Sequence, residues 1–81
     1  MTREQKIQKF LMGLCLNAGD SMEDIAKHLG VSSNSAEIKE ILHYMEQKGF
    51  IKNTRVEYKR TKTSLTKKGD KQASSLLEIA N

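Results

Sequence analysis

The spacing of the apolar residues changes at Gly49, and this change strongly limits the folds that the chain can adopt. Before Gly49, apolar residues recur every three or four positions, as they do on one face of a helix. Residues 50–65 instead mix β-branched and aromatic side chains with charged ones, which is typical of strands. The sequence therefore predicts a mainly α chain with a small β-hairpin, of the α+β class. Its 81 residues are expected to form a single domain over 1–81.

Three amphipathic helices are expected before Gly49. Thr2 with Gln5, and Asn34 with Glu37, have the spacing of a capping box, in which a side chain accepts the backbone N–H three residues later. The expected ranges are about 3–18, stopped by Gly19; 22–29, capped by Ser21 and stopped by Gly30; and 35–48, stopped by Gly49. The expected core positions are Ile7, Phe10, Leu11, Leu14, Cys15, Ala18, Met22, Ile25, Ala26, Leu29, Val31, Ile38, Ile41, Leu42 and Met45.

A two-stranded hairpin over about 50–65 and a last helix over about 67–79 are expected to follow. The hairpin turn is placed near residues 57–60, although no Asn-Gly pair marks it. Thr66 is the expected N-cap of the last helix, and Gly69 in its first turn would permit close packing against a neighbour. The core face of this helix is expected to consist of Ala73, Leu76, Leu77 and Ala80.

The basic residues are concentrated in one segment of the chain. Residues 52–71 hold eight Lys and Arg against two acids, Glu57 and Asp70, so this segment has a net charge of +6 while the whole chain has +4. The helices before it are close to neutral. A basic segment attached to a near-neutral helical body is typical of nucleic-acid-binding proteins.

Three segments together have the order and spacing of a known superfamily. They are residues 25–32 (IAKHLGVS), residues 38–51, which end in EQKGFI, and residues 65–69 (LTKKG). With these segments the chain resembles the winged helix-turn-helix superfamily, most closely regulators of the MarR (multiple antibiotic resistance regulator) and PadR type, over about residues 7–77. The resemblance implies the order helix, helix, helix, strand, strand, helix, with the third helix as recognition helix and the hairpin as wing.

The same resemblance implies sequence-specific binding of double-stranded DNA by a small transcriptional regulator. The third helix would enter the major groove, while long basic side chains of the wing would contact phosphates or the minor groove. The contacts expected from the recognition helix and its N-cap are Ser33, Asn34, Ser35, Ala36, Lys39 and His43. The contacts expected from the wing are Arg55, Tyr58, Lys59, Arg60 and Lys62.

Two glutamates and one tyrosine of this surface have alternative interpretations. Glu37 and Glu40 occupy positions where such regulators often carry Thr and Arg. Glu37 is explained as the capping-box partner of Asn34. Glu40 either accepts from a cytosine amino group or, in the favoured interpretation, forms a solvated pair with Lys39. Tyr58 either packs on a sugar or packs against the stem of the wing.

The residue patterns of catalytic and metal sites are missing from the sequence. His28 and His43 lie fifteen residues apart, with no Cys or His at ligand spacing. No nucleophile elbow, phosphate-binding glycine loop or carboxylate pair is present. The single cysteine, Cys15, is expected to be a buried apolar thiol. We therefore expect no enzymatic activity, no metal and no cofactor.

No apolar run exceeds three residues, far below the roughly 20 that span a bilayer. We expect no membrane association and a cytoplasmic protein that is associated with the nucleoid when it is bound to DNA. The short ends also leave no room for an effector pocket, so no small-molecule effector is expected.

Two other functions remain open for this sequence. Glu37, Glu40 and Glu46 make the third helix less basic than most DNA-reading helices, which suits a winged-helix protein–protein interaction module. An architectural nucleic-acid binder would use the wing without reading bases. A homodimer through the first and last helices would suit a palindromic site. The leucines and isoleucine that would form this interface, Leu76, Leu77 and Ile79, could instead close the core of the monomer.

Overall fold

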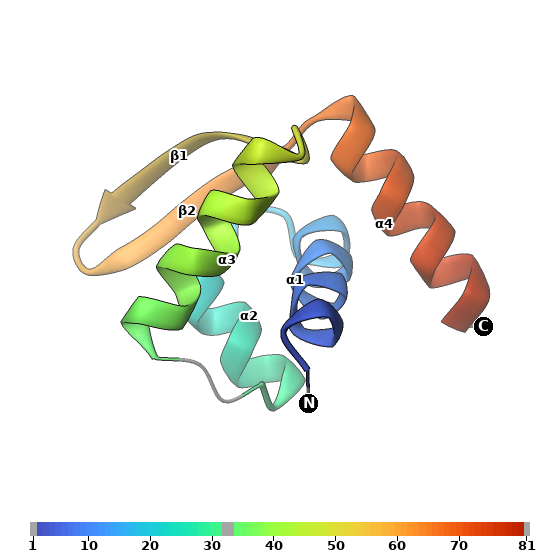
Figure 1. Ribbon diagram of the computed structural model, residues 1–81. Helices are drawn as coiled ribbons and strands as arrows, with labels where there is room; N and C mark the ends of the chain where they lie inside the picture. The colour runs from blue at the N-terminus through green and yellow to red at the C-terminus, as the bar shows by residue number, and fades with distance from the viewer. Residues whose placement is uncertain (1, 32–33, 81) are drawn as a thin grey trace.

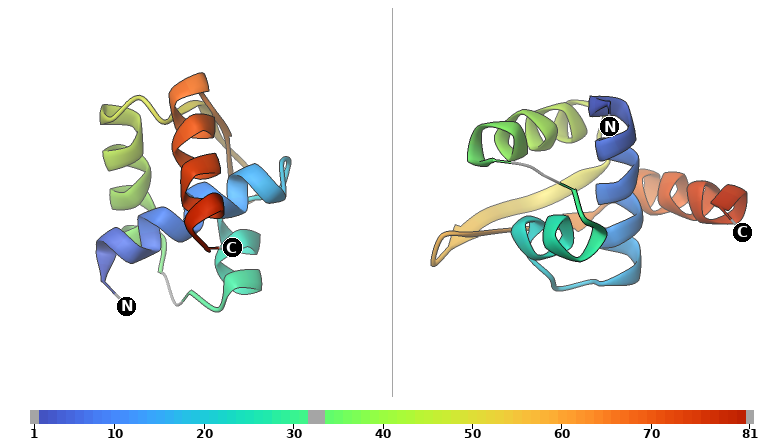
Figure 2. Two further views of the ribbon diagram at one scale, coloured as in Figure 1. Left: turned by 90° about the vertical axis from the view of Figure 1, so that its right-hand side faces the viewer. Right: turned by 90° about the horizontal axis from the view of Figure 1, so that it is seen from below.

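The structure, a computed structural model, describes residues 2–31 and 34–80, and it folds these residues into four helices and an antiparallel hairpin in the predicted order (Figure 1). The elements are α1 (Arg3–Leu16), α2 (Met22–Leu29), α3 (Ser35–Gln47), β1 (Ile51–Glu57), β2 (Arg60–Leu65) and α4 (Lys67–Ala80). This is the winged-helix order, with the hairpin as the wing. The wing and α4 project toward opposite ends of the molecule (Figures 1 and 2).

The predicted N-cap residues begin the first three helices. At α1, Thr2 and Gln5 form a complete capping box. The side chains of Ser21 and Asn34 each accept a backbone N–H from the first turn of α2 and α3, at 3.1 and 2.9 Å. A cap of this kind stabilises a helix by about 1 kcal/mol because it satisfies an N–H that has no partner within the helix.

The first helix ends earlier than predicted, at Leu16 rather than near residue 18. Asn17 leaves the helical conformation, with φ −126° and ψ 58°, and its C=O accepts the N–H of Asp20 at 3.1 Å in a turn. The positive φ of Gly19, +100°, is as predicted, but this glycine lies within the turn and not at the helix end. Ala18 is consequently exposed and does not belong to the core.

The core is built around α1, which contacts α2, α3, α4 and β2 (Figure 2). Apolar side chains from every element except β2 are buried there, and all of them except Ile51 on β1 were predicted as core positions, whereas the predicted Leu29 is only half-buried. The buried residues are Ile7, Phe10, Leu11, Leu14, Met22, Ile25, Ala26, Val31, Ile38, Ile41, Leu42, Met45, Ile51 and Ala73. Each of these side chains larger than alanine contributes roughly 1.5–3 kcal/mol of transfer free energy, which opposes the loss of conformational entropy on folding.

Cys15 is half-buried, contrary to the prediction of a fully buried thiol. It stands at the border of the core face of α1, where its Sγ lies 3.7 Å from Oδ1 of Asp70 on α4. Burial raises the pKa of the Cys15 thiol, and the neighbouring Asp70 carboxylate raises it further. The side chain is therefore kept as a neutral thiol at neutral pH.

Thr66 joins the hairpin to α4 and fastens both to the end of α3. Its Oγ1 accepts the N–H of Gly69 at 3.0 Å, which confirms the predicted cap, and donates to the C=O of Gly49 at 2.5 Å. The backbone N–H of Thr66 donates to the C=O of Phe50 at 2.9 Å. Gly69 is buried directly against Phe50, so α4 begins in contact with the backbone that leaves α3.

Beyond its first turns, α4 leaves the core. Of its predicted core face only Ala73 is fully buried, whereas Leu76 and Leu77 are half-buried and the side chain of Ala80 lies outside the described residues. Ile79 is 82% exposed. The last turns of α4 therefore extend past the helices on which they would pack (Figure 1). In the described part of the chain, no helix is both long enough and apolar enough to cross a membrane.

A bulge bends β1 between Lys52 and Arg55. Asn53 adopts a positive φ of 56° there. The hydroxyl of Thr63 donates to the C=O of Lys52 at 3.1 Å and accepts from the hydroxyl of Thr54 at 2.9 Å. These side-chain bonds replace ladder bonds that the bulge interrupts, and the bulge increases the local twist of the wing.

The two strands are joined by a two-residue turn at Tyr58 and Lys59, within the predicted segment 57–60. Both residues have positive φ, 50° and 65°, as in a type I′ turn. Neither is Gly, Asn or Asp. The turn therefore carries the steric cost of left-handed backbone, about 1 kcal/mol or more for each residue.

Replacing Tyr58-Lys59 with Asn-Gly is expected to stabilise the fold. Both new residues adopt positive φ at low cost, so the free energy of unfolding should rise by about 1 kcal/mol and the Tm by about 4–8 °C. Thermal unfolding followed by circular dichroism measures the change. Lys59→Gln is the control, because it removes the same charge without relieving the backbone. A lower Tm for the Asn-Gly variant would contradict the assignment of strain to this turn.

Candidate nucleic-acid interface

The helix α3 presents a polar face to solvent, and its N-terminal half lies at the end of the molecule where the wing projects (Figures 1 and 2). Its apolar side chains are buried on the opposite face. The exposed residues of the helix and its N-cap are Asn34, Ser35, Ala36, Lys39, Glu40, His43, Glu46 and Gln47. The structure thus exposes the predicted recognition residues Asn34, Ser35, Ala36, Lys39 and His43, while Ser33 lies outside the described residues.

Glu37 does not have the role that was predicted for it. Asn34 accepts the N–H of Glu37, but the Glu37 carboxylate binds the ammonium of Lys6 on α1 at 2.5 Å and does not complete the capping box. The Lys6 side chain is only 16% exposed, so this pair connects α1 to α3 and neutralises one acid of the recognition helix. Glu40 is exposed and forms no ion pair with Lys39 within the described residues.

The wing carries five basic residues and one acid, and the protein itself engages both of its arginines. Nε of Arg55 donates to Oε1 of Glu57 at 2.6 Å, and the Arg60 guanidinium donates to the carboxylate of Asp24 on α2. Lys59 and Lys62 form no ion pair within residues 2–31 and 34–80. All four of these cations were predicted to contact DNA, but only the two arginines are held in ion pairs within the described residues. Lys62 is attracted to the Glu57 carboxylate without pairing with it.

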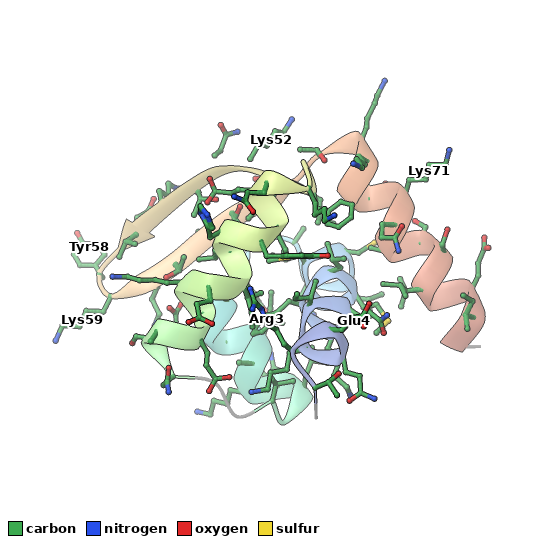
Figure 3. The ribbon with its side chains drawn as sticks, in the orientation of Figure 1. Arg3, Glu4, Lys52, Tyr58, Lys59 and Lys71 are labelled. Atoms are coloured by element: carbon green, nitrogen blue, oxygen red, sulfur yellow. The ribbon has the colours of Figure 1, made fainter. Side chains whose placement is uncertain are left out.

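Tyr58 and Lys59 point away from the body at the tip of the wing (Figure 3). The side chain of Tyr58 is 98% exposed, and Val56 in the stem is 70% exposed. The structure therefore contradicts the alternative in which Tyr58 packs on the stem. An aromatic ring beside an ammonium group on a projecting tip can cover a deoxyribose or enter a minor groove while the cation reaches a phosphate.

The outer edge of β2, the second strand of the wing, is hydrogen-bonded to the first turn of α2. Oε1 of Glu23 accepts the N–H of Thr61 at 2.7 Å, and Oε2 accepts the hydroxyl of the same residue at 2.9 Å. Asp24, the next residue, binds Arg60, the next residue along β2 toward the tip. Thr61 is only 9% exposed. The wing consequently has one free side, formed by β1 and the tip, and one side held by two acids.

Hydrogen bonds lower the pKa of the two carboxylates that bind the wing arginines, Asp24 and Glu57. The bond with Ser21, followed by that with Arg60, lowers the pKa of Asp24 below its usual 3.8. The bond from Arg55 lowers the pKa of Glu57 below 4.5. Both carboxylates are therefore charged at neutral pH, where they compete with any phosphate for the two arginines.

The histidines do not converge on a common site. His28 and His43 are both exposed, and Nδ1 of His28 lies 3.7 Å from Oδ2 of Asp20. Within the part of the chain that the structure describes, no three His, Cys, Asp or Glu side chains are grouped so that they could hold a metal ion.

Sequence reasoning missed the three long-range contacts of this region. Lys6 and Glu37 are 31 residues apart, Asp24 and Arg60 are 36 apart, and Glu23 and Thr61 are 38 apart. The acids were explained by helix dipoles and caps, and the arginines by a phosphate partner. One sequence signal could have indicated these contacts: Glu23 and Asp24 together place more negative charge in the first turn of α2 than the helix dipole requires.

No protein-family model matches the chain, and no match was found among the curated proteins. Among solved structures, the crystal structure of SSV1 F-93 is similar, with a TM-score of 0.71 and 26% sequence identity. The similarity covers 93% of this chain and 81% of that chain. It therefore includes the helices and the wing alike. In its fold this chain is a winged-helix protein, similar to SSV1 F-93 over nearly its whole length.

Proposed function

We propose that this protein binds double-stranded DNA, without catalysing a reaction, and acts as a small transcriptional regulator comparable to the MarR and PadR types. The N-terminal half of α3 would enter the major groove. The wing would follow an adjacent strand, with Lys59 and Lys62 on phosphates and Tyr58 against a sugar or in the minor groove.

One observation carries this proposal: the exposed polar face of α3 lies at the same end of the molecule as the wing tip. At this tip Tyr58 is 98% exposed, and Lys59 forms no ion pair within the described residues. A groove-reading helix beside a phosphate-binding hairpin is the docking arrangement that helix-turn-helix proteins use. The resemblance to winged-helix regulators supports the same interpretation, and the structural similarity to SSV1 F-93 supports the fold that this arrangement requires.

Measuring duplex affinity against salt concentration tests the proposal. Four lysines of this surface form no ion pair within the described residues: Lys39, Lys52, Lys59 and the half-buried Lys62. They would release about four counterions, so log K should fall with log salt with a slope of about −3 to −4. Fluorescence anisotropy of a labelled duplex gives this slope. A slope near zero would contradict duplex binding.

Sequence preference is tested separately, by selecting bound duplexes from a random library while the oligomeric state is measured in solution. An enriched palindrome with a dimeric protein would support a regulator that pairs through α1 and α4, where Leu16 and Ile79 are 64% and 82% exposed. An enriched single site would support a monomeric reader. Binding without enrichment would instead support the architectural alternative.

A protein–protein interaction module is the second candidate function. Glu40 and Glu46 are exposed on α3, and neither forms an ion pair within the described residues. Two uncompensated acids on a helix that faces phosphates reduce its attraction to DNA. Under this alternative the protein would bind duplexes only weakly at 0.15 M salt, about physiological ionic strength, and binding of a protein partner would depend on the exposed residues of α3.

A further inference from the structure

We infer that Glu23 is a positioning residue: by holding Thr61 it sets the angle at which the wing stands beside α3, and so the distance between the two DNA contacts. This inference rests on the proposed function. Glu23 itself would touch no DNA. Its effect would be transmitted through the wing, and for that reason removing this acid should weaken DNA binding even though it makes the protein more positive.

The hydrogen-bond pattern of the hairpin explains why Thr61 can be held from outside. Glu57 and Arg60 close the two-residue turn, and in an antiparallel ladder the next residue of the strand directs its N–H away from the partner strand. The N–H of Thr61 therefore points out of the hairpin. Glu23 accepts both this N–H and the Thr61 hydroxyl with its two carboxylate oxygens, at 2.7 and 2.9 Å.

Two bonds from one carboxylate to one residue restrict rotation as well as distance. Because the acceptor is ionised, each bond is stronger than a neutral one. Thr61 lies only two residues from the tip lysine, Lys59, so a change of angle at Thr61 moves the tip directly. A two-stranded hairpin has little stability of its own, and the wing therefore depends on such an external support for its orientation.

The support comes from the helix that leads into α3. α2 ends at Leu29 and α3 begins at Ser35, so Glu23 connects the wing to the element that directly precedes the recognition helix. Figure 1 shows α2 beneath the hairpin, where it packs against β2. The separation between α3 and the wing tip must match the spacing from a major groove to the neighbouring strand. A positioning residue on α2 controls this separation better than a residue on the wing itself.

Glu23→Ala is the test, and Glu4→Ala is the matched control. Both acids lie in the first turn of a helix, so both variants lose the same charge and a similar dipole interaction. Glu4 lies on α1, far from the tip of the wing (Figure 3). Glu23→Ala should weaken duplex binding by about threefold to tenfold, because a wing that is no longer held must be ordered when it binds DNA. Glu4→Ala should leave binding unchanged or slightly tighter.

Two further measurements identify positioning as the cause. In Glu23→Ala without DNA, the Thr61 amide should exchange its hydrogen faster by at least about tenfold, because its acceptor is gone, whereas Glu4→Ala should leave this rate unchanged. In hydroxyl-radical footprints on a duplex, Glu23→Ala should lose the protection given by the wing and keep that given by α3. Thr61→Val should weaken binding in the same direction, and Thr61→Ser, which keeps the hydroxyl, should restore it.

The outcomes separate this inference from the function on which it rests. If the wild-type protein does not bind duplexes, the proposed function fails and the inference fails with it. A second outcome would contradict the inference alone. In it, the wild type binds duplexes and Glu23→Ala frees the Thr61 amide, yet this variant binds and protects DNA as Glu4→Ala does. Glu23 would then hold the wing without affecting how the wing contacts DNA. Circular dichroism confirms that each variant is folded.

Discussion

Gly69→Ala is expected to destabilise the protein by about 3 kcal/mol or more, as overpacking against an immovable neighbour does. In an ordinary helix this substitution is favourable by up to about 1 kcal/mol, since alanine has the higher helix propensity. Here the new Cβ would lie 2.0 Å from the carbonyl oxygen and 2.8 Å from the carbonyl carbon of Phe50. Relief would require α4 to move away from the backbone between α3 and β1, which would break the bonds of Thr66.

Thermal or urea unfolding measures this loss, which should lower the Tm by more than about 10 °C in a domain of this size. Ser74→Ala is the control for helix propensity, because Ser74 is exposed on α4. Gly13→Ala provides a graded comparison: its Cβ would lie 2.4 Å from Cγ2 of Ile25, a side chain that can shift, so its loss should be smaller. A Gly69→Ala variant as stable as the wild type would contradict the close approach described above.

Neutralising the two wing lysines nearest the tip, as in Lys59→Gln with Lys62→Gln, is expected to weaken duplex binding by about 10- to 50-fold at 0.15 M salt and to make the salt slope shallower by about 2. Neither lysine has an ion pair within the described residues, so each can reach a phosphate without breaking one. Anisotropy titrations at several salt concentrations give both quantities.

The matched control is the double variant Lys67→Gln with Lys71→Gln. It makes the same change of net charge on the exposed side of α4, where Lys71 lies away from the wing tip (Figure 3). It should lower affinity by less than about threefold, through long-range attraction only. Equal losses for the two pairs would show that overall charge drives binding and that the wing has no special role. Arg55→Gln should also have a small effect, because Arg55 already binds Glu57.

Local sequence signals were sufficient for most of the fold. Side-chain caps at Thr2, Ser21, Asn34 and Thr66 act on N–H groups three residues away, so their spacing is readable directly. The helical period likewise predicted which side chains are buried. Errors arose at the edges of elements, where α1 ends two residues early and Cys15 stands at the border of the core face. Burial at such positions depends on where the neighbouring helix lies.

The positions of the exposed site residues also followed from the sequence, because the outward face of α3 and the tip of the hairpin are set by local periodicity and by the turn. The sequence did not show which of these charged residues are already held in ion pairs with the rest of the protein. Arg60 on β2 and Glu37 on α3 each have an ion-pair partner on a different element, and the partner is more than 30 residues away. No local pattern encodes a contact of that separation.

The sequence by itself determined that this chain is helical up to Gly49, that a basic hairpin follows, and that polar residues face outward along α3. Hydrophobic periodicity and capping are properties of neighbouring residues, which is why they can be read along the chain. Only the tertiary structure decided which basic residues of the wing lie outside internal ion pairs, because ion pairing depends on side chains that folding brings together. It also decided that the wing is held at Thr61 by Glu23, since that bond forms only where α2 and β2 pack against each other.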